Sequence, residues 1–503
     1  MFFLKQESNV QNVGTTKRTG FYDKHVQVMN LKPGFIPARN VIIDGVHINS
    51  FPFFIVIILI CTYCIQPHHT GGQVMKALWD KSVETLPINE LQALQTKRLK
   101  KLVKYVYQTN QYYKKTFDSL KLKPDDIKTL QDLEKIPFLT KQQLREYYPF
   151  GMMCTQQDDI VEVHASSGTT GKPVVGPYTR NDVELWAEVM ARSLWANGLR
   201  PADIMQNSYG YGLFTGAHGF EKGAQKIGAT VITISSGNTK RQVDIMKDFG
   251  STALACTPSY SLYIAEVAEE QGLDPQTDFN LRHGLFGAEA WSEEMRENIQ
   301  KRWGIVAHEH YGLTEIIGPG VVSECEHNRL HVNADHFYPE IIDPQTGETL
   351  PYGEDGELVF TTLTKEAFPA IRFRTRDLAS LSDEPCECGR TLPIQSRIKG
   401  RSDDMMKVKG VIVFPSQIEA ALMQVEGVSD NYQIVKSKKG DMYSLSVEVE
   451  PSENRYKEGD LDSLEKQAED EIYSILNLHV PVKAIPPKTI PRSTGKAKRV
   501  IER

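Results

Sequence analysis

The sequence predicts an α/β protein with a large amino-terminal domain, in which mostly parallel sheets are flanked by helices, and a small carboxy-terminal α+β domain. Between about residues 160 and 320, strand-like apolar runs alternate with helical patterns, an order typical of parallel sheets covered by helices. Residues 340–400 are richer in turns and β-type runs, and the last part of the chain mixes short strands with helices. A chain of 503 residues is long enough for two to four domains.

The individual elements follow from the spacing of apolar residues. A helix is expected at 88–116, where leucine and valine recur every three or four positions. Further strands are expected at 161–165, 229–235, 252–258, 356–363, 431–437 and 443–450. Further helices are expected at 181–198, 240–250, 259–272, 416–427 and 462–476. The polar stretch IKGRSDDMMKVKG marks a domain boundary near residue 400.

The first 74 residues differ from the rest, and we expect three segments: 1–74, 75–400 and 401–503. The first segment holds six Lys/Arg against three Asp/Glu, although the net charge of the whole chain is −6. Its apolar run 51–65 is shorter than the about 20 residues of a membrane-spanning helix. The same run lies too far from the start for a signal peptide.

Three interpretations of residues 1–74 stay open: a single membrane anchor, a buried strand or helix, or a stretch outside the working protein. We favour the third, with Met75 as the true start, because patterned and charged sequence begins there. On this interpretation the segment is disordered or a start-site artefact, and no membrane association is expected.

Charge and cysteine content narrow the class of protein. The net charge of −6 is unlike the basic face of a nucleic-acid-binding protein, so we expect no nucleic-acid partner. The basic residues at 97–104 are expected to form a solvated helix face. Seven cysteines are too few for a disulfide scaffold of this size, which indicates a reducing, cytoplasmic setting.

The strongest local motif is the run Ser166-Ser167-Gly168-Thr169-Thr170-Gly171-Lys172-Pro173, directly after the expected strand 161–165. Backbone N–H groups and hydroxyls of such a loop can surround a phosphate, and the lysine adds positive charge. It is not a Walker A loop, because two residues rather than four separate its glycines and proline follows the lysine.

With this loop the chain resembles the adenylate-forming enzymes, which include acyl-CoA synthetases, luciferases and peptide-synthetase adenylation domains. Four further motifs continue the resemblance in order over about residues 78–503. They are Tyr311-Gly312-Leu313-Thr314-Glu315, Arg374-Thr375-Arg376-Asp377, Gly400-Arg401-Ser402-Asp403-Asp404 and Pro491-Arg492-Ser493-Thr494-Gly495-Lys496.

Within this superfamily, residues 208–219, 285–296 and 400–419 resemble phenylacetate–CoA ligases and their relatives. The resemblance implies ATP-dependent, AMP-forming ligation of an aryl acetate, above all phenylacetate, to coenzyme A through an acyl-adenylate. It also implies a place in the catabolism of phenylacetate or aromatic amino acids. Related enzymes are often dimers, so a homodimer is a further expectation.

The resemblance assigns roles that suit the chemistry of two reacting anions. Lys172 and residues 166–171 would hold the β- and γ-phosphates, and Glu315 would bind Mg²⁺, which spreads the phosphate charge. Lys496 would stabilise the charge that develops between the carboxylate and the α-phosphate. Asp377 would accept hydrogen bonds from the ribose, and Tyr311 would stack on adenine. The remaining nucleotide-binding residues expected are Gly287, Ala288, Glu289, Gly312, Thr314 and Arg401.

The same resemblance implies an acyl pocket and a moving domain. Tyr209 and Phe214 would line the aryl pocket, with Ala288 and Pro319 nearby, since aromatic walls suit an aryl ring; plain core packing is the alternative. Asp403 would be the hinge about which the small domain rotates between adenylation and thioester formation.

A second expectation is a structural zinc site formed by Cys325, His331, Cys386 and Cys388, since zinc favours four Cys/His ligands. The spacing is unusual for zinc, so free reduced cysteines are the alternative, and His327 competes with His331 as a ligand.

Two other functions stay open at this point. A coenzyme F390 synthetase-like enzyme would use the same motifs to transfer AMP to a deazaflavin. A non-catalytic nucleotide-binding relative is the other alternative, although such a protein has no need of Lys496.

Overall fold

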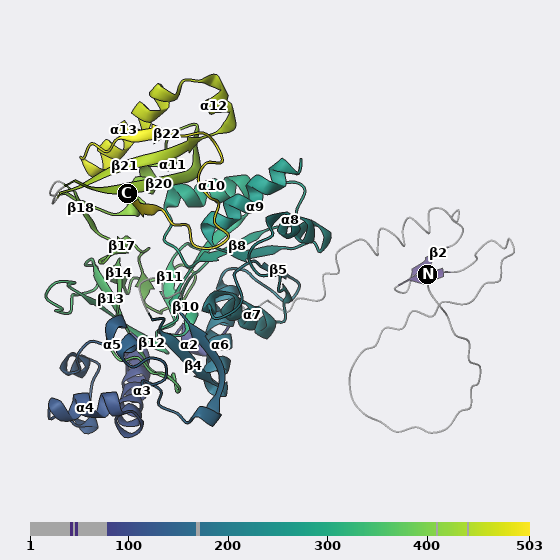
Figure 1. Ribbon diagram of the computed structural model, residues 1–503. Coiled ribbons are helices and arrows are strands. Elements are labelled where there is room, and N and C mark those ends of the chain that lie inside the picture. Colours follow the sequence, from purple (N-terminus) through teal and green to yellow (C-terminus); the bar gives the residue numbers. More distant parts are fainter. Residues whose placement is uncertain (1–40, 44–45, 49–77, 167–171, 409–410, 440–441) are drawn as a thin grey trace. The chain divides into compact units, whose positions relative to one another are not determined.

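The computed structural model describes residues 41–43, 46–48, 78–166, 172–408, 411–439 and 442–503 (Figure 1). The chain divides into two compact units, Met1–Met75 and Lys76–Arg503. In the first unit, β1 (Val41–Ile43) pairs antiparallel with β2 (Val46–Ile48). The apolar run 51–65 and the cysteines at its end lie outside the described residues, so the three interpretations of residues 1–74 stay predictions.

The second unit begins with helices. The expected helix 88–116 is two helices, α3 (Ile88–Thr109) and α4 (Gln111–Ser119). The break falls at Asn110, whose extended backbone ends α3 and whose side-chain oxygen accepts hydrogen bonds from the first N–H groups of α4. An asparagine that caps a helix competes with helix continuation, which the apolar spacing alone does not reveal. The other short elements of this region are α2 (Lys81–Glu84), α5 (Lys141–Glu146), η1 (Pro124–Asp126), η2 (Gln131–Lys135) and η3 (Gln157–Asp159).

The strand that precedes the phosphate-loop motif is not part of the large sheet. β3 (Ile160–Ala165) pairs antiparallel with β4 (Val175–Thr179), and the two form a separate two-stranded sheet. The sequence therefore predicted the position of this strand correctly. The strand nevertheless lies outside the parallel sheet that its alternation with helices had indicated. The hairpin brackets residues 166–174, so it fixes both ends of the loop motif.

The main sheet of the large domain has nine strands, in the order β15-β16-β11-β10-β9-β8-β7-β5-β6. Neighbouring strands run parallel from β6 to β9, and antiparallel from β9 to β15. The strands are β5 (Ile204–Asn207), β6 (Thr230–Ile232), β7 (Ala253–Cys256), β8 (His283–Gly287), β9 (Val306–Leu313), β10 (Gly318–Glu324), β11 (Leu330–Val332), β15 (Leu381–Ser382) and β16 (Ile394–Gln395). The fold class is confirmed, with the parallel pairing confined to one half of the sheet.

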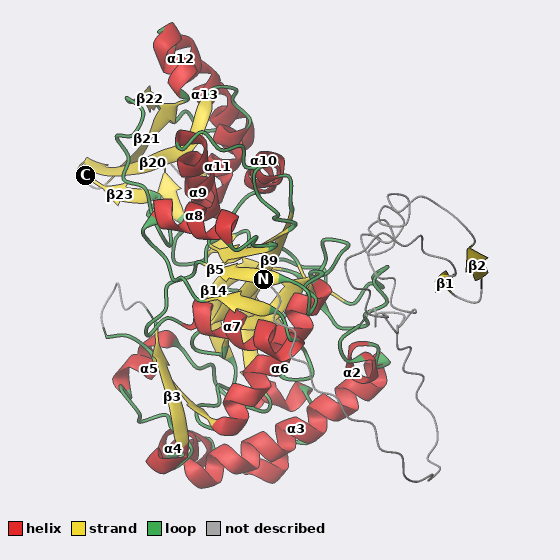
Figure 2. Cartoon of the chain, turned by 90° about the vertical axis from the view of Figure 1, so that its right-hand side faces the viewer, coloured by secondary structure: helices red, strands yellow, loops and turns green. Residues whose placement is uncertain are grey.

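Helices cover both faces of this sheet (Figure 2). Ala253 and Ala255 of β7 belong to one apolar core, and Leu254 and Cys256 belong to another, because successive strand residues point to opposite faces. The first core includes α6 (Arg180–Ala196) and α7 (Thr215–Ile227). The second includes α8 (Thr239–Asp248), α9 (Pro258–Glu270) and α10 (Glu293–Trp303). The near-continuous burial of β7 is typical of a strand covered on both sides.

A second, antiparallel sheet completes the large domain. Its order is β12-β13-β14-β17, formed by β12 (Phe337–Ile342), β13 (Gly356–Thr362), β14 (Phe373–Ala379) and β17 (Gly400–Arg401). The last pairing sets Asp377 directly opposite Arg401. This sheet therefore joins the expected ribose-binding motif to the expected hinge motif.

The carboxy-terminal part has its own apolar core. Its four-stranded sheet has the order β22-β21-β20-β23, with β20 (Val428–Lys439), β21 (Met442–Pro451), β22 (Val482–Ala484) and β23 (Val500–Glu502). The remaining elements are the hairpin β18 (Met406–Val408) and β19 (Val411–Val413), and the helices α11 (Pro415–Met423), α12 (Glu453–Glu458) and α13 (Leu461–Leu476). Among the described residues of the whole chain, no helix is long and apolar enough to span a membrane.

Candidate active site

The phosphate-loop motif is described at its two ends. Ser166 follows β3, its backbone N–H donates to the carbonyl of Val174, and its hydroxyl accepts from the Val174 N–H at 2.9 Å. Lys172 is exposed, with its ammonium group 5.4 Å from the ring centre of Tyr148. Ser167, Gly168, Thr169, Thr170 and Gly171 lie outside the described residues, so their phosphate-binding role stays a prediction.

The motif at 311–315 lies at the carboxyl end of β9 and in the turn after it. Gly312 packs so closely on the facing strand that a Cβ there would lie 1.9 Å from the carbonyl oxygen of Gly318, so no larger residue fits. Glu315 is buried, with 3% of its surface exposed. Its carboxylate pairs with the ammonium group of Lys141 at 2.9 Å. A buried carboxylate held by one lysine can exchange that partner for an incoming cation.

Asp377 is the centre of a small polar group on β14. The hydroxyl of Tyr311 donates to one carboxylate oxygen at 2.6 Å, and Arg401 donates to the other at 2.8 Å. Burial raises the pKa of Asp377, while Arg401 and the tyrosine hydroxyl act in the opposite direction. Arg401 also binds the exposed Asp403 through two hydrogen bonds, of 2.9 and 3.1 Å. The expected ribose, base and hinge residues are thus one connected group.

The segment that carries Lys496 is held against the large domain by its backbone. Thr257 donates to the carbonyl of Gly495 at 3.1 Å, and Glu289 accepts from the N–H of Ala497 at 3.0 Å. Glu289 also accepts from the N–H of Ser259, so it ties this tail to the start of α9. These contacts bring Lys496 to the cavity that contains Glu315.

Lys496 is exposed in the wall of this open cavity. Partial loss of hydration there lowers the pKa of Lys496 below its ordinary value, and Glu289 and Asp377 oppose the shift. The group is a cation close to two carboxylates.

A cavity of about 160 Å³ connects these groups to the expected acyl pocket. Tyr209, Phe214, Ala288 and Pro319, which were predicted to bind the aryl group, all line it. The predicted Ser166, Gly287, Gly312, Thr314, Glu315, Arg401 and Lys496 line it as well. The structure therefore gathers most of the predicted residues around one space, with charged groups and aromatic rings in its wall.

Comparison with known proteins decides the family. A sequence model of the AMP-binding enzymes matches residues 62–363, and a model of the AMP-binding enzyme C-terminal domain matches residues 410–503. Phenylacetate–coenzyme A ligase of Thermus thermophilus is 42% identical over 442 residues, 84% of this chain and 99% of the relative. The phenylacetate–coenzyme A ligase of Escherichia coli is 45% identical over 429 residues, 84% of this chain and 96% of the relative.

The chain belongs to the AMP-binding enzymes, in the phenylacetate–coenzyme A ligase family. The structure of this AMP-binding enzyme agrees. It resembles 2-hydroxyisobutyryl-CoA ligase in the postadenylation state with a TM-score of 0.82 and 28% identity, over 86% of this chain and 94% of the other. The score is 0.65 against the same ligase in its thioesterification state, at 29% identity over 86% of this chain and 93% of the other.

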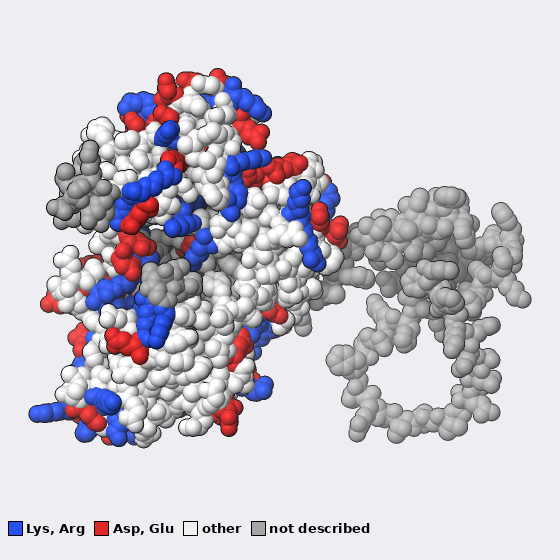
Figure 3. Space-filling view, viewed as in Figure 1, with Lys and Arg blue, Asp and Glu red and all other residues white. Residues whose placement is uncertain are grey.

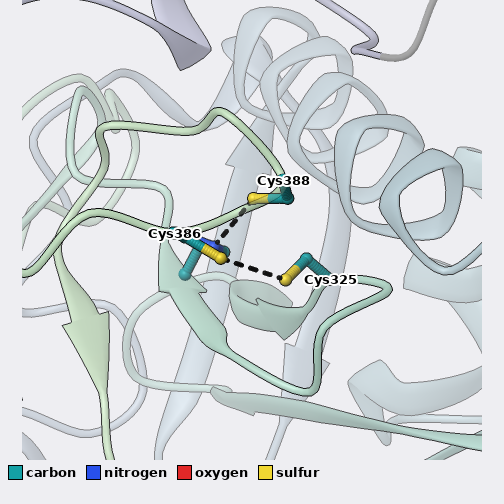
Figure 4. A group of neighbouring side chains, drawn as sticks. Cys325, Cys386 and Cys388 are labelled. Atoms are coloured by element: carbon teal, nitrogen blue, oxygen red, sulfur yellow. Dashed lines mark hydrogen bonds between the residues drawn. The ribbon is translucent and has the colours of Figure 1, made fainter.

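This AMP-binding enzyme also brings the four expected metal ligands together, and Figure 4 shows the three cysteines side by side. The ligand atoms of Cys325, His331, Cys386 and Cys388 all lie within 4.8 Å of one another. The sulfur atoms of Cys325 and Cys386 are 3.7 Å apart, and Cys388 lies 3.3 Å from Nε2 of His331. His327, the rival ligand, lies beside the exposed Glu387.

A second cluster of this AMP-binding enzyme was not foreseen from the sequence. Glu162, His164 and His218 have ligand-type atoms within 4.8 Å of one another. The ammonium group of Lys222 lies 3.0 Å from the Glu162 carboxylate, which His164 also contacts at 2.7 Å. The hydrogen bond from His164 and the charge of Lys222 lower the pKa of Glu162 to about 2, although burial acts the other way. The cluster is internally neutralised and needs no bound cation.

Sequence reasoning also missed three residues that line the cavity: Lys141, Phe220 and His310. Lys141 comes from α5 and Phe220 from α7, and neither belongs to a recognised motif. His310 comes directly before Tyr311, so its position next to a motif was the available signal.

On the face drawn in Figure 3, the described basic and acidic side chains are intermixed, unlike a continuous basic track for nucleic acid.

Proposed function

We propose that this enzyme joins phenylacetate to coenzyme A with cleavage of ATP to AMP and pyrophosphate. The observation that carries the proposal is the shared cavity, in which Lys496 and Glu315 line the same space as Tyr209 and Phe214. Phenylacetate–coenzyme A ligases that are 42% and 45% identical to this chain support the choice of acid and acceptor. These relatives favour a CoA ligase over a deazaflavin adenylyltransferase or a non-catalytic protein.

In the first half-reaction, a carboxylate oxygen of the acid attacks the α-phosphorus of ATP, and pyrophosphate leaves. Lys496 would lie between the two anions, where a positioned cation stabilises the charge of the transition state. Asp377 would exchange its bonds to Tyr311 and Arg401 for the ribose hydroxyls. Tyr311 would then be free to stack on adenine, while Gly287, Ala288 and Glu289 border the nucleotide.

Residues at the phosphate end of the cavity fit a magnesium ion. Glu315 offers a buried carboxylate, and carboxylates together with phosphate oxygens are the ligands that Mg²⁺ prefers. Bound there, Mg²⁺ would spread the negative charge of the phosphates. Lys141 pairs with Glu315 in the structure and would then turn to a phosphate oxygen. Lys172 and residues 166–171 would hold the remaining phosphates.

In the second half-reaction, the thiol of coenzyme A attacks the acyl carbon and AMP leaves. We propose that the boundary between the two domains lies near residue 400 and that the small domain turns about Asp403, withdrawing Lys496. Asp403 is exposed, and its side chain contacts Arg401 of the same short segment, as suits a hinge. The higher TM-score against a postadenylation state than against a thioesterification state supports two poses of this kind.

The test is an assay of AMP formation with ATP, coenzyme A and a panel of aryl acetates, benzoates and fatty acids. AMP formation that requires both an aryl acetate and coenzyme A is expected. Pyrophosphate release without free AMP, with the adenylyl group transferred to an added deazaflavin, would instead support the adenylyltransferase. No AMP formation with any aryl acetate overturns the proposal.

We also propose that Cys325, His331, Cys386 and Cys388 hold a structural zinc ion. Two thiolates bound at 2.3 Å in a tetrahedron lie about 3.8 Å apart, close to the 3.7 Å between Cys325 and Cys386. Nδ1 of His331 lies 3.2 Å from the carbonyl of Leu392, a contact that fixes the ring so that Nε2 faces the sulfur atoms. Four protein ligands leave no open position, so the ion has no catalytic role here.

Metal analysis of the purified chain tests this site. About one zinc per chain is expected in the wild type, and much less in the double variant Cys386→Ser/Cys388→Ser. Cys154→Ser is the matched control, because Cys154 is a buried free cysteine outside the cluster. Equal zinc in all three proteins would contradict the proposal.

The absence of disulfides among the described cysteines also fits the expected cytoplasmic setting. A homodimer stays a proposal for solution measurements.

A further inference from the structure

An ion pair joins the tail that carries Lys496 to the large domain. The guanidinium group of Arg492, on the same tail, donates two hydrogen bonds to the carboxylate of Glu266 on α9, both of 3.1 Å. A third hydrogen bond, of 2.9 Å, goes to Glu450 on β21 of the carboxy-terminal sheet. The side chain of Glu266 is 23% exposed and that of Glu450 only 1%. One arginine thus binds a carboxylate on each side of the expected domain boundary.

Other ion pairs cross the same boundary. Arg302 of α10 donates to Asp430 of β20 at 3.3 Å, and Lys488 pairs with Glu270 at the end of α9. Figures 1 and 2 show α9 and α10 beside the carboxy-terminal sheet. Of these three ion pairs, the one made by Arg492 has two parallel hydrogen bonds, the geometry that makes an arginine–carboxylate pair strong and specific.

Apolar packing contributes little to this interface. Among the described residues, the apolar core that contains α9 and α10 has no member after Ala307, and the carboxy-terminal core has none before Met406. A cavity of about 360 Å³ lies at the interface, lined by residues of α9, β20 and the tail. Polar interfaces of this kind allow two domains to move, whereas a large apolar interface resists motion. The docking of the small domain therefore depends on separate polar contacts.

We propose that the ion pair of Arg492 with Glu266 holds the small domain in the adenylating pose, positions Lys496 for the first half-reaction and opens before the second. This inference rests on the proposed function and names a pair of residues that sets the balance between its two half-reactions. Arg492 and Glu266 act through the position of Lys496, so they are positioning residues.

The second carboxylate on Arg492 makes the contact reversible. Glu450 also accepts hydrogen bonds from the backbone N–H groups of Lys488 and Ile490, so it belongs to the internal structure of the small domain. When the domain turns, Arg492 keeps Glu450 and loses only Glu266, which becomes hydrated on the surface of α9. Neither charge is left buried without a partner, which is the costly result of breaking a buried ion pair. The pair can therefore open in each turnover.

The experiment measures two rates for the wild type, Glu266→Gln, Glu266→Lys and Asp470→Asn. The first is the rate of pyrophosphate release in the first turnover without coenzyme A. The second is the rate of thioester formation from supplied phenylacetyl-adenylate and coenzyme A. With rapid exchange between the poses, each rate is proportional to the population of its pose. The ratio of the second rate to the first then reports the docking equilibrium, whichever pose dominates.

We expect this ratio to rise about three- to tenfold in Glu266→Gln, and further in Glu266→Lys, which repels Arg492. Asp470→Asn is the matched control, because it removes an exposed carboxylate whose partner, Lys466, lies on the same helix, α13. It should leave the ratio unchanged. Since salt screens an ion pair, about 0.5 M NaCl should raise the ratio in the wild type and much less in Glu266→Gln.

An unchanged or lower ratio in both Glu266 variants would overturn the inference. This holds also where both rates fall together and thermal unfolding shows a loss of stability, since the pair would then support the fold alone. A rise of equal size in Asp470→Asn would overturn it as well, because a general change of charge would be the cause. All these results leave the proposed function intact. A wild type that forms no AMP with any aryl acetate is a different result, and it contradicts the proposed function itself.

Discussion

Strand β9 presents Glu309 and Tyr311 on one face and His308 and His310 on the other. The two pairs of side chains differ in whether they have hydrogen-bond partners within the protein. Glu309 accepts from Arg397 at 2.8 Å, and Tyr311 donates to Asp377 at 2.6 Å. The two histidines, equally buried, have no hydrogen-bond partner among the described residues. One face of this strand thus has its hydrogen bonds within the protein, while the two imidazoles of the other face pack against the rings of Phe220 and His283.

The face of β9 that carries Glu309 and Tyr311 continues into a buried network of ion pairs and hydrogen bonds. Glu324 accepts two hydrogen bonds from Arg296, both of 2.8 Å, one from Arg397 and one from the backbone of Glu309. Every charge of this group has a partner, which is the condition for ionic groups in a poorly hydrated interior. Paired groups such as these hold the strands in place, whereas Lys496, exposed in the wall of the cavity, is open to ligands.

Breaking the paired face should have the largest effect. Glu324→Ala leaves Arg296 and Arg397 without their shared carboxylate, and we expect a loss of roughly 3–5 kcal/mol in the free energy of unfolding. Denaturant unfolding measures it. The control is Asp470→Ala, whose exposed pair with Lys466 contributes less than about 1 kcal/mol. A loss of similar size in both variants would mean that the buried network contributes no more to the free energy of unfolding than an exposed ion pair does.

The cavity side is tested next through Lys496. We expect Lys496→Ala to lower the rate of adenylate formation by about 10²–10³-fold, because a cation that stabilises the transition state is lost. The rate of thioester formation from supplied acyl-adenylate should be nearly unchanged. Lys498→Ala, an exposed lysine of the same tail, is the control. Equal loss of both half-reactions would rule out a role confined to adenylation.

Asp377 belongs to both sides of the comparison, since its carboxylate is paired in the structure and is expected to bind ribose. Asp377→Asn keeps the shape and removes the charge, so we expect KM for ATP to rise about 10- to 100-fold. Thermal unfolding measured alongside separates the two roles. A large loss of stability with an unchanged KM for ATP would show that Asp377 stabilises the fold and does not bind the ribose.

The smallest effect concerns Lys365, a fully buried lysine whose ammonium group makes no hydrogen bond among the described residues. Its nearest support is the ring of Tyr178, 4.5 Å from the ammonium group. Burial lowers the pKa of Lys365 to about 8, while Asp182 and Glu315 act the other way. The folded state therefore binds this proton less tightly than the unfolded state, and the free energy of unfolding should rise between about pH 8 and pH 10.

Lys365→Met removes the charge at nearly constant length, so it should remove this slope. At pH 7 we expect a gain of about 1–2 kcal/mol, since the buried charge is gone but the contact with the Tyr178 ring is lost. Unfolding curves of both proteins from pH 7 to 10 measure the difference. The same pH slope in the two proteins would show that Lys365 does not cause it.

The sequence predicted the candidate site residues because each motif is local. Ser166, Tyr311, Glu315, Asp377 and Lys496 were identified as residues of short runs, and the structure brings all of them to one region. Local patterns also placed most helices and strands. They failed where a single residue overrides the pattern, as Asn110 does in ending α3, and where a strand pairs in a separate local hairpin, as β3 does with β4.

By itself, then, the sequence determined the fold class and the family and predicted the candidate site residues, because these depend on local spacing and on short motifs. Only the tertiary structure decided which side chains meet across the fold: the pair of Lys141 with Glu315, the closeness of the four Cys/His ligands, and the packing of His310 on Phe220 beside the acyl cavity. The reason is physical. Partners brought together by the packing of separate elements leave no periodic trace along the chain, and whether a buried polar group is satisfied depends on all its neighbours at once.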